Sequence, residues 1–114
     1  MILRRIADLP EEGVSHDVDV LKRVVLRHGE VPHLCQFATS KIPPGVATSA
    51  HSHTDMIEVF RVQTGQLRVT IDGTVHDLAE GDTITIQLGE VHVLENPASQ
   101  GDLEILYFGI QVEG

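Results

Sequence analysis

The sequence is poor in the residues that several kinds of binding require. It contains no tryptophan, one tyrosine and three phenylalanines, so the stacking platforms that bind single-stranded nucleic acid are not expected. Lysine and arginine together number 8 against 17 acidic residues, and the formal charge of −9 disfavours nucleic acid and anionic membranes. We therefore expect neither nucleic acid nor a membrane as a partner.

Cysteine and long apolar runs are also scarce. The single cysteine, Cys35, excludes a disulfide bond within the chain and fits a reducing compartment. Residues 1–8 carry two arginines but no apolar run of signal-peptide length, and no later stretch approaches the roughly 20 apolar residues of a membrane span. We therefore expect a cytoplasmic protein. Cys35 is interpreted as a packing residue and not a nucleophile, because no histidine and acid accompany it in sequence.

Short alternating segments separated by glycine and proline predict an all-β fold. Residues 66–71 alternate polar and apolar side chains, and Asp72-Gly73 is a strong hairpin signal before a return strand. The return strand and four further strands are expected over residues 74–78, 21–28, 33–39, 83–86 and 103–110. No stretch has the period of a long amphipathic helix, which favours a sandwich or a barrel.

The domain organisation expected from this length is a single domain with one core, since the chain has 114 residues. Residues 1–20 show no sustained period, and we expect an N-terminal arm that lies over the barrel or exchanges with a neighbouring subunit. The barrel domain is then expected over residues 21–114. Segment 103–110 is apolar on both faces, so a partner is expected to cover its outer face. This pattern predicts a homodimer.

Candidate metal ligands are concentrated in segment 45–65. His51 and His53 are two residues apart, so on a strand both imidazoles would project from one face. Glu58 follows His53 at an odd offset, which requires a turn, and Thr54-Asp55 is the polar pair expected to make it. The segment therefore offers two imidazoles and one carboxylate, and a fourth ligand must come from elsewhere.

A second segment, 81–96, contains a further histidine, His92, as a candidate for that ligand. The two segments together resemble the paired sequence motifs of the cupin superfamily. The matching positions are Gly45, His51, His53, Glu58 and Gly65 in the first motif and Gly81, Gly89, His92 and Asn96 in the second. One position departs from the family, because this chain has Gln87 where proline is usual. That change concerns how the turn is held and not the ligands.

The resemblance implies a single cupin-type double-stranded β-helix, or jelly-roll barrel, within the all-β class. It also implies that four residues bind one divalent metal inside the barrel: His51, His53, Glu58 and His92. Three imidazoles and one carboxylate without a thiolate suit Fe, Mn, Ni, Zn or Cu better than calcium. The apolar wall of the site is expected to consist of Phe60, Val62, Leu67, Val69, Ile84 and Ile86.

Several other residues have a less specific interpretation. Gln36, Phe60 and Tyr107 fit either a pocket wall or ordinary packing. The histidines outside the motifs are interpreted as structural or surface residues: His16, His28, His33 and His76. Arg61 and Arg68 are predicted to face outward, so the sequence names no arginine that would clamp an anionic substrate. It identifies no catalytic residue beyond the metal ligands.

Two functions of different classes follow. The first is a metalloenzyme, dioxygenase-like or an isomerase, whose metal would bind a small chelating substrate that is anionic or enolisable. The second is a noncatalytic module that binds or senses a small ligand or a metal. The architecture does not decide between them, because function resides in the site and this fold carries many.

Overall fold

The protein folds almost entirely into β-strands. A computed structural model describes residues 1–14 and 17–112. Within these residues a 3₁₀ helix, η1 (Ile6–Asp8), precedes nine strands, and no α-helix is present. The strands are β1 (Glu12–Val14), β2 (Asp17–Leu26), β3 (Leu34–Ile42), β4 (Met56–Thr64), β5 (Leu67–Ile71), β6 (Thr74–Leu78), β7 (Thr83–Ile86), β8 (His92–Glu95) and β9 (Leu103–Gln111).

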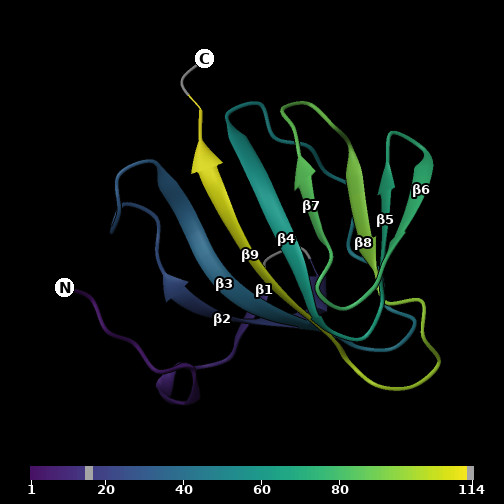
Figure 1. Cartoon of the computed structure of the whole chain (residues 1–114), viewed down its shortest axis with the longest axis horizontal. Coiled ribbons are helices and arrows are strands. Elements are labelled where there is room, and N and C mark those ends of the chain that lie inside the picture. The colour runs from purple at the N-terminus through teal and green to yellow at the C-terminus, as the bar shows by residue number, and fades with distance from the viewer. Residues whose placement is uncertain (15–16, 113–114) are drawn as a thin grey trace.

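The strands form two antiparallel sheets, which draw together at the bottom of Figure 1 and spread apart at the top. The larger sheet has the order β1-β2-β3-β9-β4-β7, and the smaller has the order β6-β5-β8. The segment between β3 and β4 joins them, because its isolated bridges Ala47–Glu95 and His51–His92 pair it with β8. The predicted all-β jelly-roll barrel is confirmed.

The core lies between the two sheets and is built from alternate strand positions. Leu67 and Val69 on β5 and Leu103 on β9 are fully buried, while their sequence neighbours face outward or are less buried. The buried cluster as a whole contains Val20, Ile42, Phe60, Val62, Leu67, Val69, Leu78, Ile86, Leu94, Leu103 and Ile105. One face of each sheet is therefore committed to the core, with a cavity left beside the candidate ligands.

Most of the predicted strands are confirmed, with shifts at their ends. The β5–β6 hairpin turns at Asp72-Gly73, where φ is 47° and 85°, the left-handed values that this turn requires. Strand β3 continues to Ile42 and ends directly before Pro43, which cannot donate to a strand ladder. The predicted start of the first strand at Leu21 is wrong, because β2 begins at Asp17. The first residues of β2 are charged or exposed, so the sequence shows no alternation of buried and exposed positions before Val20.

Among residues 1–14 and 17–20, the 3₁₀ helix η1 and strand residues are separated by irregular structure. Strand β1 and the first part of β2 form the edge of the larger sheet. Before them, Arg4 donates to the backbone carbonyl of Val25 at 2.7 Å and to Glu30 Oε1 at 2.6 Å, which ties this segment to β2 and the loop beyond it. Exchange of the segment with a neighbouring subunit stays a prediction.

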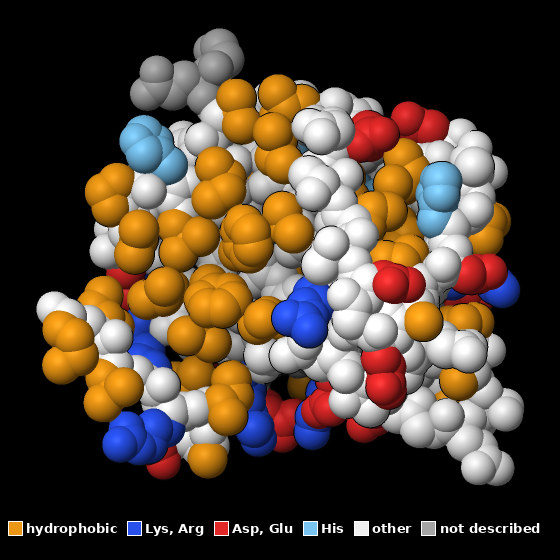
Figure 2. All heavy atoms as spheres, viewed as in Figure 1, with side chains coloured by type: hydrophobic (Ala, Val, Ile, Leu, Met, Phe, Trp, Pro, Cys, Tyr) orange, Lys and Arg blue, Asp and Glu red, His pale blue; other side chains and the backbone are white. Residues whose placement is uncertain are grey.

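Strand β9 is central in the larger sheet, between β3 and β4, and both of its faces are apolar as predicted. Leu103 and Ile105 are buried in the core, whereas Leu106 and Phe108 alternate with them on the other face. Figure 2 shows apolar side chains gathered on this outer face, over β3, β9 and β4. Phe37 of β3 and Phe108 meet there edge to face, with ring centroids 6.5 Å apart.

Of the residues that the structure describes, none belongs to a helix long and apolar enough to pass through a membrane.

Candidate metal centre

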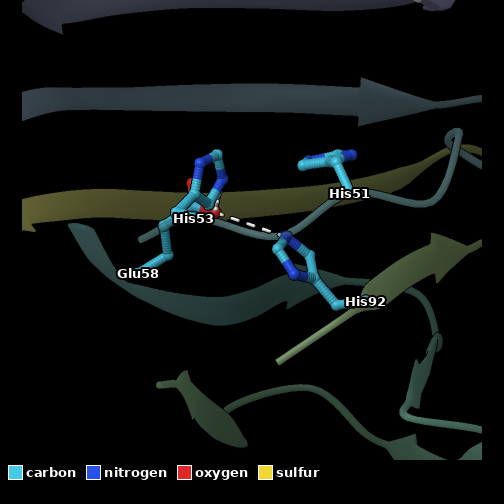
Figure 3. A group of neighbouring side chains, drawn as sticks. All are labelled: His51, His53, Glu58 and His92. Atoms are coloured by element: carbon cyan, nitrogen blue, oxygen red, sulfur yellow. Dashed lines mark ion pairs between the residues drawn. The ribbon is translucent and has the colours of Figure 1, made fainter. Parts of the chain in front are cut away.

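The structure brings together all four predicted ligand residues, His51, His53, Glu58 and His92, whose side chains converge in Figure 3. One candidate ligand atom from each lies within 4.8 Å of the others. The first two come from the segment before β4, Glu58 from β4 itself, and His92 from the start of β8. These residues could hold a metal ion.

Backbone pairing places the two motifs against each other. His51 and His92 exchange hydrogen bonds between their main chains, with N···O distances of 3.2 and 2.9 Å. The chain bends at Thr54 and Asp55 as predicted, and this bend allows Glu58 to face the histidines. Gly89 donates its N–H to the carbonyl of His53 at 2.8 Å, and its φ of 77° is a conformation that glycine adopts readily.

Two of the imidazoles are oriented by backbone carbonyls. Nδ1 of His51 lies 2.9 Å from the carbonyl oxygen of Ser49, and Nδ1 of His92 lies 3.1 Å from that of Glu90. A carbonyl only accepts hydrogen bonds, so in each ring Nδ1 carries the proton and Nε2 keeps its lone pair. This is the arrangement by which proteins fix metal-binding histidines.

Burial increases from His51, which is exposed, to His92, which is 1% exposed. Oε1 of Glu58 lies 3.0 Å from Nε2 of His53 and 3.4 Å from Nε2 of His92. Within the described residues, this oxygen and Nε2 of His92 are nevertheless buried without a hydrogen-bond partner. Orphaned buried polar atoms are costly, and one cation between them would satisfy both. The donor set therefore fits a transition-metal ion.

The electrostatic environment of His92 favours positive charge. Burial by itself disfavours the imidazolium, but the Glu58 carboxylate and the Glu90 carbonyl outweigh it and raise the pKa of His92 above its ordinary value. A group of side chains that stabilises a proton at this point would also attract a metal cation.

The turn before His92 gives Gln87 a role that proline could not fill. The Gln87 N–H donates to Oε1 of Glu90 at 2.6 Å, and proline has no N–H to donate. Glu90 in turn positions His92 through its carbonyl. The departure from the usual family residue therefore adds a hydrogen bond that braces the turn next to a candidate ligand.

A cavity of about 240 Å³ is lined by three of the four residues, His51, His53 and Glu58. Gln36, Phe60 and Tyr107 all line it, which decides in favour of the pocket-wall interpretation. Phe60 and Tyr107 stack with ring centroids 5.3 Å apart. Burial, assisted by the negative charge of Glu58, raises the pKa of Tyr107 to about 12. Its hydroxyl therefore remains a hydrogen-bond donor at neutral pH.

The prediction of the apolar wall is correct for Phe60 and wrong for the other five residues. None of these five lines the cavity: Val62, Leu67, Val69 and Ile86 belong to the buried core, and Ile84 packs against it. Alternation identifies the inward face of a strand but not which part of that face is covered by the opposite sheet.

The sequence interpretation missed the contribution of β2, and of Ser40 on β3, to this cavity. Val20 and Lys22 of β2 and Ser40 of β3 line it. The available signal was the alternation of Val20, Lys22 and Val24, which puts a lysine on the same face as two buried valines.

The remaining candidates lie away from the centre. His28, His33 and His76 are exposed and are not part of the cluster, as predicted, whereas His16 lies outside the described residues. Cys35 is half-buried, and burial raises the pKa of its thiol, which disfavours the reactive thiolate. The two arginines predicted to face outward do not line the cavity: Arg61 is exposed and Arg68 pairs with Asp77 at 2.8 Å.

Comparison with curated proteins finds a partial relative. The chain is 41% identical over 56 residues to mannose-1-phosphate guanylyltransferase from Escherichia coli (strain K12). The match covers 49% of this chain but 12% of that enzyme, so this protein corresponds to a small part of its relative.

Solved structures and a family model cover much more of the chain. A predicted oxalate decarboxylase from Thermotoga maritima matches with a TM-score of 0.88 at 24% identity, over 97% of this chain and 100% of that one. The polyketide cyclase RemF from Streptomyces resistomycificus matches with a TM-score of 0.81 at 18% identity, over 99% and 80%. At 24% and 18% identity, these similarities show a shared fold. A model described as "Cupin domain" matches residues 38–109. Because that match spans more than half of the sequence, the chain belongs to the cupin family.

Proposed function

We propose that this cupin binds one divalent transition metal through His51, His53, Glu58 and His92 and acts there on a small chelating acid, as a dioxygenase-like oxidoreductase or an isomerase. The observation that carries the proposal is the pair of buried atoms without hydrogen-bond partners, Glu58 Oε1 and His92 Nε2, at the centre of the cluster. A cation there would compensate both groups.

The residues around the cluster have different roles in binding the ligand. A bound divalent ion supplies Lewis-acid chemistry and open positions for a chelating ligand. Tyr107 donates a hydrogen bond to an oxygen of the ligand, since its phenol is protonated at neutral pH. Phe60, Ile42 and Leu94 belong to the apolar part of the cavity wall, which excludes water.

The size of the cavity sets the size of the ligand. Pockets for drug-sized molecules usually have volumes of about 300–1,000 Å³. The cavity here has a volume of about 240 Å³ and therefore suits a smaller molecule. An acid that chelates through two oxygens fits both this volume and the metal.

Metal content is the first test. Protein purified without added metal or an affinity tag should contain near-stoichiometric iron, manganese, nickel, zinc or copper by elemental analysis. His51→Ala and His92→Ala should lose it, because each removes one ligand. His76→Ala is the matched control, since His76 is exposed on β6 and should leave the metal content unchanged. Full metal content in both ligand variants, with circular dichroism confirming the fold, would contradict the proposal.

A noncatalytic binding module is the alternative, and the composition of the cavity favours it in one respect. Apart from His51, His53 and Glu58, its titratable lining groups are Asp17, Lys22 and Tyr107. Both carboxylate oxygens of Asp17 accept hydrogen bonds from Ser49. Tyr107 titrates far above neutrality, so it is not poised as a general acid or base at neutral pH. Oxygen consumption or product formation by the Fe²⁺-loaded protein with small chelating acids, lost in His51→Ala, would establish the enzyme. Tight binding without any product would establish the module.

We also propose a homodimer formed through the outer face of β3, β9 and β4. This face presents Phe37, Leu106 and Phe108 toward the outside, and Figure 2 shows how many apolar side chains surround them. A second copy can cover such a face because a two-fold axis pairs a patch with itself. Light scattering should give a dimer mass for the wild type and for Val75→Glu, an exposed position on β6, but a monomer mass for Phe108→Glu. A wild-type monomer at micromolar concentration would contradict this prediction.

A further inference from the structure

We propose that Lys22 binds the far carboxylate of a dicarboxylic acid whose other end occupies the metal centre. The proposal rests on the metal-binding function inferred above and specifies its substrate class. Lys22 is a specificity-determining residue in this arrangement, because it selects the length and charge of the ligand.

The side chain of Lys22 faces the interior of the barrel. It lies on β2 between Val20 and Val24, which are 3% and 5% exposed and share its face. Its partner in the strand register is Ser40 of β3, which is 4% exposed. The same cavity is lined by Lys22 and by His51, His53 and Glu58.

The carboxylates near Lys22 on the cavity side are engaged with other groups. Within the described residues Lys22 forms no ion pair. Asp17 accepts a hydrogen bond from the Ser49 N–H at 2.8 Å. Glu12, the register partner of Lys22 on β1, accepts from Arg27 at 2.6 Å. The ammonium group is therefore left without a protein anion on this side.

A second cavity, of about 230 Å³, also borders Lys22 and offers no better partner. Its carboxylates are Glu11, which pairs with Arg23 at 3.8 Å, and Glu104, which pairs with Lys41 at 3.9 Å. A half-buried lysine without a counter-ion is costly, and an anionic ligand in the metal-side cavity would compensate it.

Lys22 is also the one lysine or arginine among the described residues that line the metal-side cavity. A chain with a net charge of −9 would repel an acid from most of its surface. The metal centre and Lys22 are then the two places inside the barrel where carboxylates are stabilised.

The strand register determines how far apart the two ends of the ligand lie. Lys22 is level with Ser40, Ile105 and Val62 across the sheet, and Val62 is four residues beyond Glu58 on β4. Four residues of strand span about 13 Å along the strand direction, and the strands β3 and β9 separate Lys22 from β4 across the sheet. The curvature of the sheet and the flexible four-carbon stem of lysine shorten this gap but do not close it. A compact acid such as oxalate cannot bridge the two points, whereas a longer dicarboxylate can.

The polar groups between the two ends suit the same ligand. Gln36 is level with Glu58 across the sheet, and Tyr107 lies opposite Phe60, between the level of Glu58 and that of Lys22. Both line the cavity and can donate hydrogen bonds to ligand oxygens. The geometry thus favours a linear acid that chelates the metal through a keto or hydroxy carboxylate.

Calorimetric titration of the Mn²⁺-loaded protein with two matched acids tests the inference. α-Ketoglutarate has the distal carboxylate, and α-ketovalerate has a methyl group in its place. The wild type should bind α-ketoglutarate about tenfold more tightly, the effect of one hydrogen bond to a charged group. Lys22→Met should bind the two acids equally and keep its Mn²⁺ content. Lys22→Arg should retain the preference, as should the control Lys41→Met, whose lysine pairs with Glu104 outside this cavity.

The outcomes separate the two proposals. An undiminished preference in Lys22→Met, or equal affinities in the wild type, would overturn the role of Lys22 while leaving the metal site intact. Failure of the wild type to bind Mn²⁺, Fe²⁺ or Zn²⁺ would overturn the metal function and this inference with it.

Discussion

Tyr107 offers a direct measurement of the interior of the barrel. The chain has one tyrosine and no tryptophan, so the ultraviolet absorbance of tyrosinate reports on this residue alone. Burial and the negative charge of Glu58 raise its pKa from the ordinary value near 10 to about 12. Each pKa unit corresponds to about 1.4 kcal/mol, so the shift corresponds to roughly 3 kcal/mol in favour of the folded, protonated form.

The sign of this effect defines the pH range in which it is visible. The pKa of Tyr107 is higher in the folded state than in the unfolded state, so its contribution to stability is fully present below about pH 10. The contribution is lost as the pH rises from about 10 through about 12. The free energy of unfolding, measured with urea, should fall over this interval by an amount of this order.

Absorbance titration of the metal-free protein should give a midpoint near pH 12, and the urea-unfolded chain should titrate near 10. Adding metal, or replacing Glu58 by Gln, should lower the folded midpoint, because either change offsets the negative charge that disfavours tyrosinate. Tyr107→Phe supplies the blank. A midpoint near 10, in protein that circular dichroism shows to be folded, would refute the argument that Tyr107 is a buried, neutral donor in the cavity.

Three further predictions concern neighbouring positions. In Gly109→Ala the new Cβ would overlap Sδ of Met56, which lines the cavity, so the Met56 side chain should turn inward. Calorimetry should then show weaker acid binding at unchanged metal content. Unchanged acid affinity would contradict this prediction. Asn96 is 1% exposed, and its side chain makes three hydrogen bonds to the backbone. Asn96→Ala should therefore lower the free energy of unfolding, measured in urea, by at least about 2 kcal/mol. A loss below roughly 0.5 kcal/mol would contradict this prediction. Acidification should release the metal, because protons compete with it for His92, whose pKa is raised. Equilibrium dialysis measures the metal occupancy, and full occupancy well below the ordinary histidine pKa would argue for different ligands.

The sequence by itself determined the candidate ligand set and the fold class. The spacing of His51, His53 and Glu58 lies within one short motif, and His92 lies within a second, so each motif can be read from neighbouring residues. The turn at Asp72-Gly73 was equally predictable, because only a few residue pairs adopt its backbone conformation. The bracing role of Gln87 required the structure, since its partner, the Glu90 carboxylate, is identified by geometry and not by spacing.

Only the tertiary structure decided what surrounds the centre. Alternation assigned Phe60 and Val62 to one face. Both belong to the buried core, but of the two only Phe60 also lines the cavity. Lys22 faces the metal-side cavity because β2 pairs with β3 and β3 with β9, contacts between residues far apart in the chain. A pattern of period two specifies which residues share a face. Which of them line a cavity depends on the cross-strand register and on what the opposite sheet covers.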